Sequence, residues 1–180
     1  MATQNEIPIS KTIDNGNPEA SRKKTRILTL RTSDAEEFDV PESAAMLSVT
    51  IKHMVEDGCT MNKIPLPVVD GRTLARVIGY LIKHADGGVS DEEKRDFDEE
   101  FVAGVEMSVL FDVVLAANYL NIKGLLDLVC QEIADRMQNK SVRWVRKTFG
   151  IDNDFTPEEE EQIKNEHAWA WEGVDSDDDD

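Results

Sequence analysis

The chain is organised around one largely apolar segment, residues 105–137. In the second half of this segment, apolar residues recur at steps of three and four, which places them on one face of a helix. These residues are Ile122, Leu125, Leu126, Val129, Cys130, Ile133, Ala134 and Met137. Each large side chain that is fully buried contributes roughly 1.5–3 kcal/mol to stability, so this helix is expected to lie against a core.

The first half of the segment carries two apolar stripes. The first stripe consists of Val109, Leu110, Val113, Val114 and Ala117, and the second, at a spacing of four, of Met107, Phe111, Leu115 and Tyr119. A surface helix turns one stripe towards its own core, and a second stripe then needs another partner. Two interpretations stay open: a second protein covers the second stripe, or both stripes are internal.

Upstream, short strands precede helices. Residues 27–30 and 38–40 predict two strands joined by a turn at residues 32–34, and two short helical segments follow within residues 41–58. Residues 64–68 are apolar, but their two prolines exclude a central strand. They predict an edge strand or an extended connection. A small sheet followed by a run of helices indicates an α+β fold.

Polar residues mark the ends of the predicted helices. Asp70 is expected to cap a helix that runs to His84. Ser141 is expected to cap a short helix that ends at Gly150. Thr156 and the Pro-Glu-Glu that follows it form a capping box with proline at the first helical position, which predicts the last helix.

Three other segments lack helical or strand periodicity. Residues 86–100 are rich in Gly, Asp and Glu and have no repeating apolar pattern apart from Phe97, so they predict a charged, mobile loop. Residues 1–25 and the acidic tail 173–180 are expected to be disordered, because they bury too little surface to offset ordering. A basic cluster within residues 22–26 has two interpretations, a weak nuclear signal or a plain soluble tail.

Aromatic residues near the C-terminus stand on thin helices among dense acidic residues. Phe149, Phe155, Trp169 and Trp171 are the rings concerned. Rings that such helices do not cover suit the surface of a partner protein. The alternative, that they dock onto the domain of their own chain, stays open from the sequence.

Composition narrows the classes of function. The 180 residues suffice for one domain with appendages. Lys+Arg 20 against Asp+Glu 37 gives a net charge of −17, which argues against nucleic acid or an anionic membrane as the main partner. No apolar run is long enough to span a bilayer, and no secretory signal is expected. Cys59 and Cys130 form no disulfide framework, and Cys130 is expected to be buried. These features predict an intracellular, reduced, soluble protein.

The residue pattern offers no catalytic, cofactor-binding or metal site. His53, His84 and His167 are far apart in sequence, and neither a Gly-rich phosphate loop nor a Cys/His nucleophile pattern is present. Four successive glutamates, residues 158–161, lack the alternation of a calcium loop and suit the positive end of a helix better. An enzyme is therefore not expected.

Three separated motifs resemble one known family. Residues 115–127 have the sequence LAANYLNIKGLLD, residues 145–149 the sequence VRKTF and residues 153–161 the sequence NDFTPEEEE. These motifs resemble those of the S-phase kinase-associated protein adaptors, and their sequences are closest to those of plant members. Such adaptors link cullin to F-box proteins in SCF ubiquitin ligases, so the resemblance implies a non-enzymatic subunit of a heteromeric complex in the nucleus and cytoplasm.

The resemblance also implies a division of the chain and two binding surfaces. A BTB/POZ-like, cullin-binding domain is expected at residues 26–135, and C-terminal helices that engage an F-box at residues 136–172. The cullin surface implied by position consists of Leu110, Val114, Asn118 and Tyr119. The F-box surface implied by position consists of Ile133, Met137, Val145, Phe149, Ile151, Phe155 and Trp169. The cullin set agrees only in part with the second stripe, because Leu110 and Val114 belong to the first.

Departures from the family pattern gather on the F-box side. Residues 141–144 are Ser-Val-Arg-Trp where the family has Thr-Pro-Glu-Glu, and Arg136 stands where an apolar residue is common. Two alternatives to a general adaptor therefore stay open. One is a degenerate adaptor that binds cullin without general F-box binding, and the other is a BTB-type scaffold that self-associates.

Overall fold

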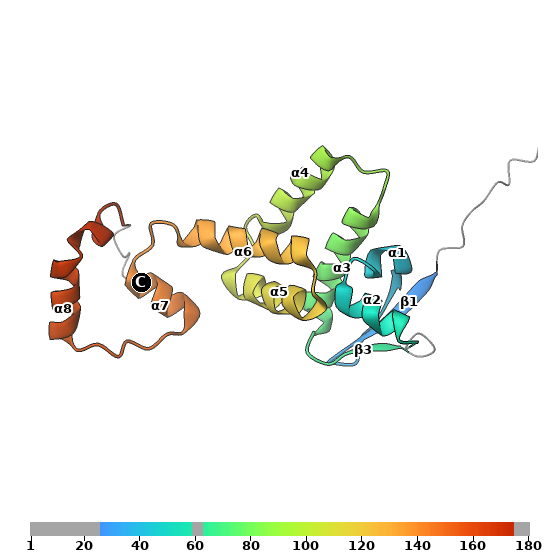
Figure 1. Ribbon diagram of the computed structural model, residues 1–180, viewed down its shortest axis with the longest axis horizontal. Coiled ribbons are helices and arrows are strands. Elements are labelled where there is room, and N and C mark those ends of the chain that lie inside the picture. Colours follow the sequence, from blue (N-terminus) through green and yellow to red (C-terminus); the bar gives the residue numbers. More distant parts are fainter. Residues whose placement is uncertain (1–25, 59–62, 175–180) are drawn as a thin grey trace, which may run out of the picture.

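A small mixed sheet forms one end of the molecule in the computed structural model, which describes residues 26–58 and 63–174 (Figure 1). Its strands are β1 (Ile27–Thr32), β2 (Glu37–Pro41) and β3 (Ile64–Leu66), in the order β2-β1-β3. Strand β2 is antiparallel to β1 and β3 is parallel to it. Because β3 pairs on one side only, its proline is tolerated there, and the edge-strand prediction is confirmed.

Helices make up most of the remaining described chain. They are α1 (Glu42–Ala45), α2 (Val49–Glu56), α3 (Gly71–Ala85), α4 (Asp91–Val102), α5 (Met107–Leu120), α6 (Lys123–Met137), α7 (Val142–Phe149) and α8 (Pro157–Glu166), with a 3₁₀ turn, η2 (Ala168–Trp171). The predicted α+β class is confirmed. None of the described helices is long and apolar enough to cross a membrane.

The helix ends lie where the capping residues predicted them. Asp70 Oδ1 accepts a hydrogen bond of 2.7 Å from the amide of Thr73 at the start of α3. Ser141 Oγ accepts one of 3.0 Å from the amide of Trp144 at the start of α7, which ends at Gly150 in the left-handed conformation (φ 64°). A capping box opens α8. These bonds satisfy amides that a helix leaves without an internal partner.

One expectation was wrong: much of residues 86–100, predicted as a mobile loop, forms α4. Its start is a capping box in which Ser90 Oγ accepts from the Glu93 amide (3.2 Å) and the Glu93 carboxylate accepts from the Ser90 amide (2.8 Å). Its buried residues, Phe101 and Val102, lie at its C-terminal end, and Phe97 packs partly buried against the core. A hydrogen bond of 2.8 Å between His84 Nε2 and Asp98 ties it to α3. Capping and tertiary contacts thus outweigh the absence of periodicity.

The core lies where α5 packs against α3 and α6 (Figure 1). Fully buried side chains there include Leu74, Leu81, Leu110, Leu120 and Leu125. A second expectation was also wrong, because Cys130 is exposed. The eight apolar positions between Ile122 and Met137 span too wide an arc for one buried face, so α6 itself buries only the narrower stripe Leu125, Val129 and Ile133.

A serine joins the sheet end of the domain to α5. Ser48 is fully buried, and its Oγ donates to the carbonyl of Leu120 at the end of α5 (2.6 Å) and accepts from the amide of Ile51 (3.1 Å). Replacing Ser48 by alanine removes both bonds and leaves a buried carbonyl without its donor.

We therefore expect Ser48→Ala to lower the free energy of unfolding by about 1–3 kcal/mol, measured by urea denaturation. Ser33→Ala, in an exposed turn, is the matched control and should change it by less than about 0.5 kcal/mol. Equal losses in the two variants would show that the Ser48 bonds do not hold α2 to α5.

Candidate protein-docking site

The outer face of α5 is the first candidate surface. Leu115 is 67% exposed, and Phe111, Val114 and Tyr119 are half-buried beside it. Together with the exposed Asn118 they define the α5 surface. The prediction that α5 is two-sided is confirmed. The first stripe supplies most of the buried face of α5, and the second stripe reaches the surface.

The four residues implied as a cullin surface do not all lie on this face. Asn118 is exposed, and Val114 and Tyr119 are half-buried, so all three are accessible to a partner. Leu110 is fully buried against the core, so a partner does not reach it without opening the domain. Its assignment to a contact surface is corrected: Leu110 holds α5 in place, as its position on the first stripe indicated.

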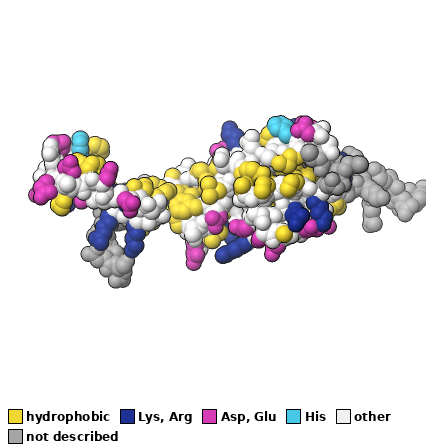
Figure 2. All heavy atoms as spheres, turned by 90° about the horizontal axis from the view of Figure 1, so that it is seen from below, with side chains coloured by type: hydrophobic (Ala, Val, Ile, Leu, Met, Phe, Trp, Pro, Cys, Tyr) yellow, Lys and Arg dark blue, Asp and Glu magenta, His cyan; other side chains and the backbone are white. Residues whose placement is uncertain are grey.

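Sequence reasoning missed two neighbours of the α5 surface. Leu47 is 42% exposed and Val49 37% exposed, and the Val49 amide donates to the carbonyl of Asn121 just after α5 (3.5 Å). Thr50 Oγ1 donates to the carbonyl of Tyr119 (2.8 Å). The start of α2 therefore extends the apolar surface of α5, a proximity that no local sequence pattern reveals. Figure 2 shows hydrophobic side chains gathered along the middle of one face of the molecule (Figure 2).

The second candidate surface is the C-terminal arm, residues 138–174, which projects from the end of α6 away from the sheet (Figure 1). None of α7, α8 and η2 has a buried residue. Large apolar side chains stand out from it, with exposed fractions of 40% for Phe149, 54% for Ile151, 44% for Phe155 and 72% for Trp169. The arm therefore does not cover its own rings.

The seven residues implied as an F-box surface fall into two groups, residues of the arm, which are exposed or half-buried, and residues of α6, which are half-buried or buried. Phe149, Ile151, Phe155 and Trp169 are exposed, and Val145 is half-buried. Met137, at the end of α6, is half-buried and packs against the core, and Ile133 is buried. The exposed rings thus belong to the arm, while the two α6 residues form its base.

Polar contacts give the arm a defined shape in place of a core. Arg146 Nη1 lies 2.7 Å from Glu160 Oε1, joining α7 to α8. Asn153 donates to the same oxygen (2.8 Å), and the Arg146 guanidinium lies 5.7 Å from the centre of the Phe155 ring. The hydrogen bond from Arg146 lowers the pKa of Glu160 below its ordinary value. Phe155 is therefore held in position while its ring stays exposed.

One ring contact connects the two surfaces. The rings of Phe111 on α5 and Phe149 on α7 lie with their centres 5.0 Å apart and are tilted by 50°. This distance is within the range of favourable aromatic pairs. The first helix of the arm therefore lies beside the α5 surface.

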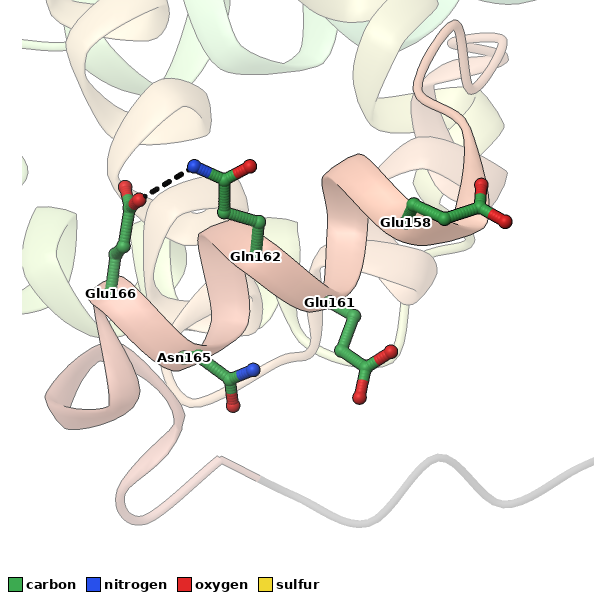
Figure 3. Close-up of a pocket in the computed structure, with 5 residues that line it drawn as sticks. All are labelled: Glu158, Glu161, Gln162, Asn165 and Glu166. Atoms are coloured by element: carbon green, nitrogen blue, oxygen red, sulfur yellow. Dashed lines mark hydrogen bonds between the residues drawn. The ribbon is translucent and has the colours of Figure 1, made fainter.

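The hollow on α8 is not a ligand site by its geometry. Its lining comes from a single helix: Glu158, Glu161, Gln162, Asn165 and Glu166. Figure 3 shows the carboxylates pointing in different directions, with one hydrogen bond of 2.8 Å from Gln162 to Glu166 (Figure 3). Within residues 26–58 and 63–174 no group of His, Cys, Asp or Glu side chains is arranged to hold a metal ion. What the two surfaces offer is apolar and aromatic contact area.

A small sheet and helical cluster, followed by an arm with uncovered rings, forms a protein-interaction module. Comparison with protein families identifies its domain as POZ-type. Residues 26–86 match the Skp1 family, tetramerisation domain, and residues 123–170 match the Skp1 family, dimerisation domain.

Relatives match over most of the chain. SKP1-like protein 1 of Oryza sativa subsp. japonica is 46% identical, with 85% of this chain and 99% of the relative covered. SKP1-like proteins 4 and 13 of Arabidopsis thaliana are 46% and 48% identical, each over 82% of this chain and over 97% and 99% of their own length. The chain belongs to the Skp1 family, the adaptor subunits of SCF ubiquitin ligases.

The carboxylates at the start of α8 give a pH-dependent prediction. Hydrogen bonds from the Thr156 amide and hydroxyl lower the pKa of Glu159, and the hydrogen bond from Arg146 lowers that of Glu160. Both carboxylates therefore stabilise the folded arm at a pH above 4.5, their ordinary pKa. This contribution is lost as the pH falls through the lowered pKa values of the folded state.

We expect NMR titration of the side-chain carboxyl carbons to give midpoints below 4.5 for both glutamates. Thr156→Ala should raise the midpoint of Glu159 alone, and Arg146→Met that of Glu160 alone. Each variant thus serves as the control for the other. Midpoints that move together in both variants, or in neither, would contradict these contacts.

Proposed function

We propose that this chain joins a cullin to an F-box protein, with the α5 surface as the cullin-binding face and the C-terminal arm as the F-box-binding face. The observation that carries the proposal is the arm itself, whose helices bury none of their side chains while Arg146 and Glu160 hold them in a defined arrangement. Helices that expose fixed rings suit a partner that supplies the missing core.

The cullin-binding face is proposed from accessibility and chemistry. Leu115 and Tyr119 provide apolar area, and Asn118 provides an exposed amide for orientation. Leu47 and Val49 enlarge this area at the start of α2. The α5 helix is fixed from behind by the core, so the surface is rigid before a partner arrives, which reduces the entropic cost of binding.

The proposed F-box-binding face adds the arm to the end of α6. Val145 and Met137 are half-buried, and the exposed anchors are Trp169, Phe155, Phe149 and Ile151. Residues 141–144 depart from the family pattern, yet Ser141 still caps α7. The departures are therefore proposed to narrow the choice of F-box partners without abolishing binding.

A non-catalytic role is proposed for the chain. Among its histidines, His84 stacks on Tyr80 with ring centres 4.0 Å apart and bonds to Asp98, which is a structural role between α3 and α4. Burial raises the pKa of Tyr80 to about 12, so its hydroxyl stays protonated near neutral pH. Ubiquitin transfer is assigned to other subunits, and a distribution between nucleus and cytoplasm is proposed with the adaptor role.

The cullin half of the proposal is tested with Tyr119→Lys. A lysine on this face removes the phenol ring and buries a charge in an apolar contact, so cullin affinity should fall about tenfold or more while F-box affinity stays within about twofold. Isothermal titration calorimetry with purified partners measures both. Ile82→Lys, at an exposed apolar position on α3, is the matched control and should leave both affinities unchanged. Loss of both affinities in Tyr119→Lys with retained circular dichroism would contradict the proposal.

The F-box half is tested with Trp169→Ala. Truncating an aromatic anchor costs about 2 kcal/mol or more, which weakens F-box binding about 30-fold. Cullin binding should be unaffected, because Trp169 belongs to the arm and is 72% exposed in the free chain. Unchanged F-box affinity would remove the arm from the interface.

A further inference from the structure

The guanidinium of Arg136 lies at the point where the arm leaves the domain. Arg136 is the penultimate residue of α6, and all three of its side-chain nitrogens are engaged. Nε donates to Glu132 Oε1 (2.7 Å), Nη2 donates to the carbonyl of Val102 (2.9 Å), and Nη1 donates to the carbonyl of Val105. The side chain is 27% exposed, so these bonds form largely out of water.

The two carbonyls belong to the connection between α4 and α5. Val102 is the last residue of α4, and Val105 lies two residues before α5 begins. The Val102 carbonyl lies at the C-terminus of α4, where the partial negative charge of the helix end favours a cation, and it also accepts from the Val105 amide (3.3 Å). The planar guanidinium has a fixed fork of donors, which lets one side chain hold two carbonyls at a defined angle. Arg136 thereby fastens α6 to α4 and to the start of α5.

Two features bear on the direction of the arm: the last turn of α6, and the Phe111–Phe149 ring pair between α5 and α7. Residues 138–141 connect α6 to α7 in a tight path, with Asn139 in the left-handed conformation (φ 63°) and the Lys140 amide bonded to the carbonyl of Met137 (3.0 Å). A short, bonded connection transmits the orientation of the helix end to the segment that follows it. A shift of the last turn of α6 therefore becomes a swing of α7 and α8.

We propose that Arg136 is a positioning residue that fixes the angle between the C-terminal arm and the α5 surface. Arg136 fixes this angle in the free chain. Its consequence in a complex, the fixed placement of an F-box protein relative to a cullin, rests on the proposed function.

The test is a pair of spin labels on the full chain, one on α2 at His53→Cys and one on α8 at Asn165→Cys, with Cys59 and Cys130 replaced by serine. Double electron–electron resonance then measures the distance distribution between domain and arm. Arg136→Met keeps a long side chain and removes the donors, and should widen the distribution about twofold or more. Arg136→Lys keeps a charge that reaches one carbonyl, and should give an intermediate width.

The control is Arg26→Met, which removes another arginine–glutamate pair, Arg26 with Glu42 (3.0 Å), far from the arm. It should leave the distribution unchanged. An unchanged width in Arg136→Met would overturn the proposal, even if its unfolding temperature falls, because a merely stabilising role lowers that temperature without moving the arm. If Arg136→Met fails to fold, Arg136→Lys decides: a widened distribution supports the proposal and a wild-type width overturns it.

Affinity measurements test the role of Arg136 separately from the proposed function. With an F-box peptide, Arg136→Met should bind about three- to tenfold more weakly than the wild-type chain, because a mobile arm is ordered on binding. Cullin affinity should stay within about twofold. A widened distribution in a chain whose wild-type form binds no F-box peptide would support the role of Arg136 and contradict the proposed function alone.

Discussion

Burial of one face of α5 is the contact on which the rest of the structure depends. Leu110, Val113, Ala117 and Leu120 are fully buried between α3 and α6, and Ser48 fastens the end of the helix to α2. A helix packed this way keeps its opposite stripe outside, because side chains at a period of 3.6 residues cannot all turn inward. The α5 surface is thus a consequence of how the core closes.

The arm follows a different physical rule from the domain. It has no buried residue, and its shape comes from capping bonds, the Arg146–Glu160 pair and the Phe111–Phe149 contact. An exposed ion pair contributes little stability, so the arm is ordered enough to present its rings and too open to cover them. Repulsion from the net charge of −17 opposes non-specific association of chains through these uncovered rings.

The sequence predicted best those features that depend on local chemistry. Asp70, Ser141 and Thr156 cap their helices as expected, because a cap needs only a side chain and amides two or three residues away. The same local rule was available at Ser90 and Glu93, but the absence of apolar periodicity outweighed it, and α4 was missed.

Features that depend on packing depth were harder to predict. Cys130 lies on the broad apolar face of α6, but only the solved packing shows that the buried stripe is narrower. The family resemblance placed Leu110 on a binding surface, although the apolar periodicity placed it on the first stripe. In the structure it is fully buried in the core. The contacts of Val49, Thr50 and Arg136 join segments that are distant in sequence, which one sequence does not reveal.

The domain buries its own core without the arm, and the arm leaves its rings for a partner to cover. Hydrogen–deuterium exchange of the free chain, compared with the chain saturated by an F-box peptide, tests this directly. We expect α5 amides to exchange slowly in both states, and α7 and α8 amides to exchange faster than α5 amides in the free chain and more slowly in the complex than in the free chain. Arm amides that are as protected as those of α5 before any partner is added would contradict it.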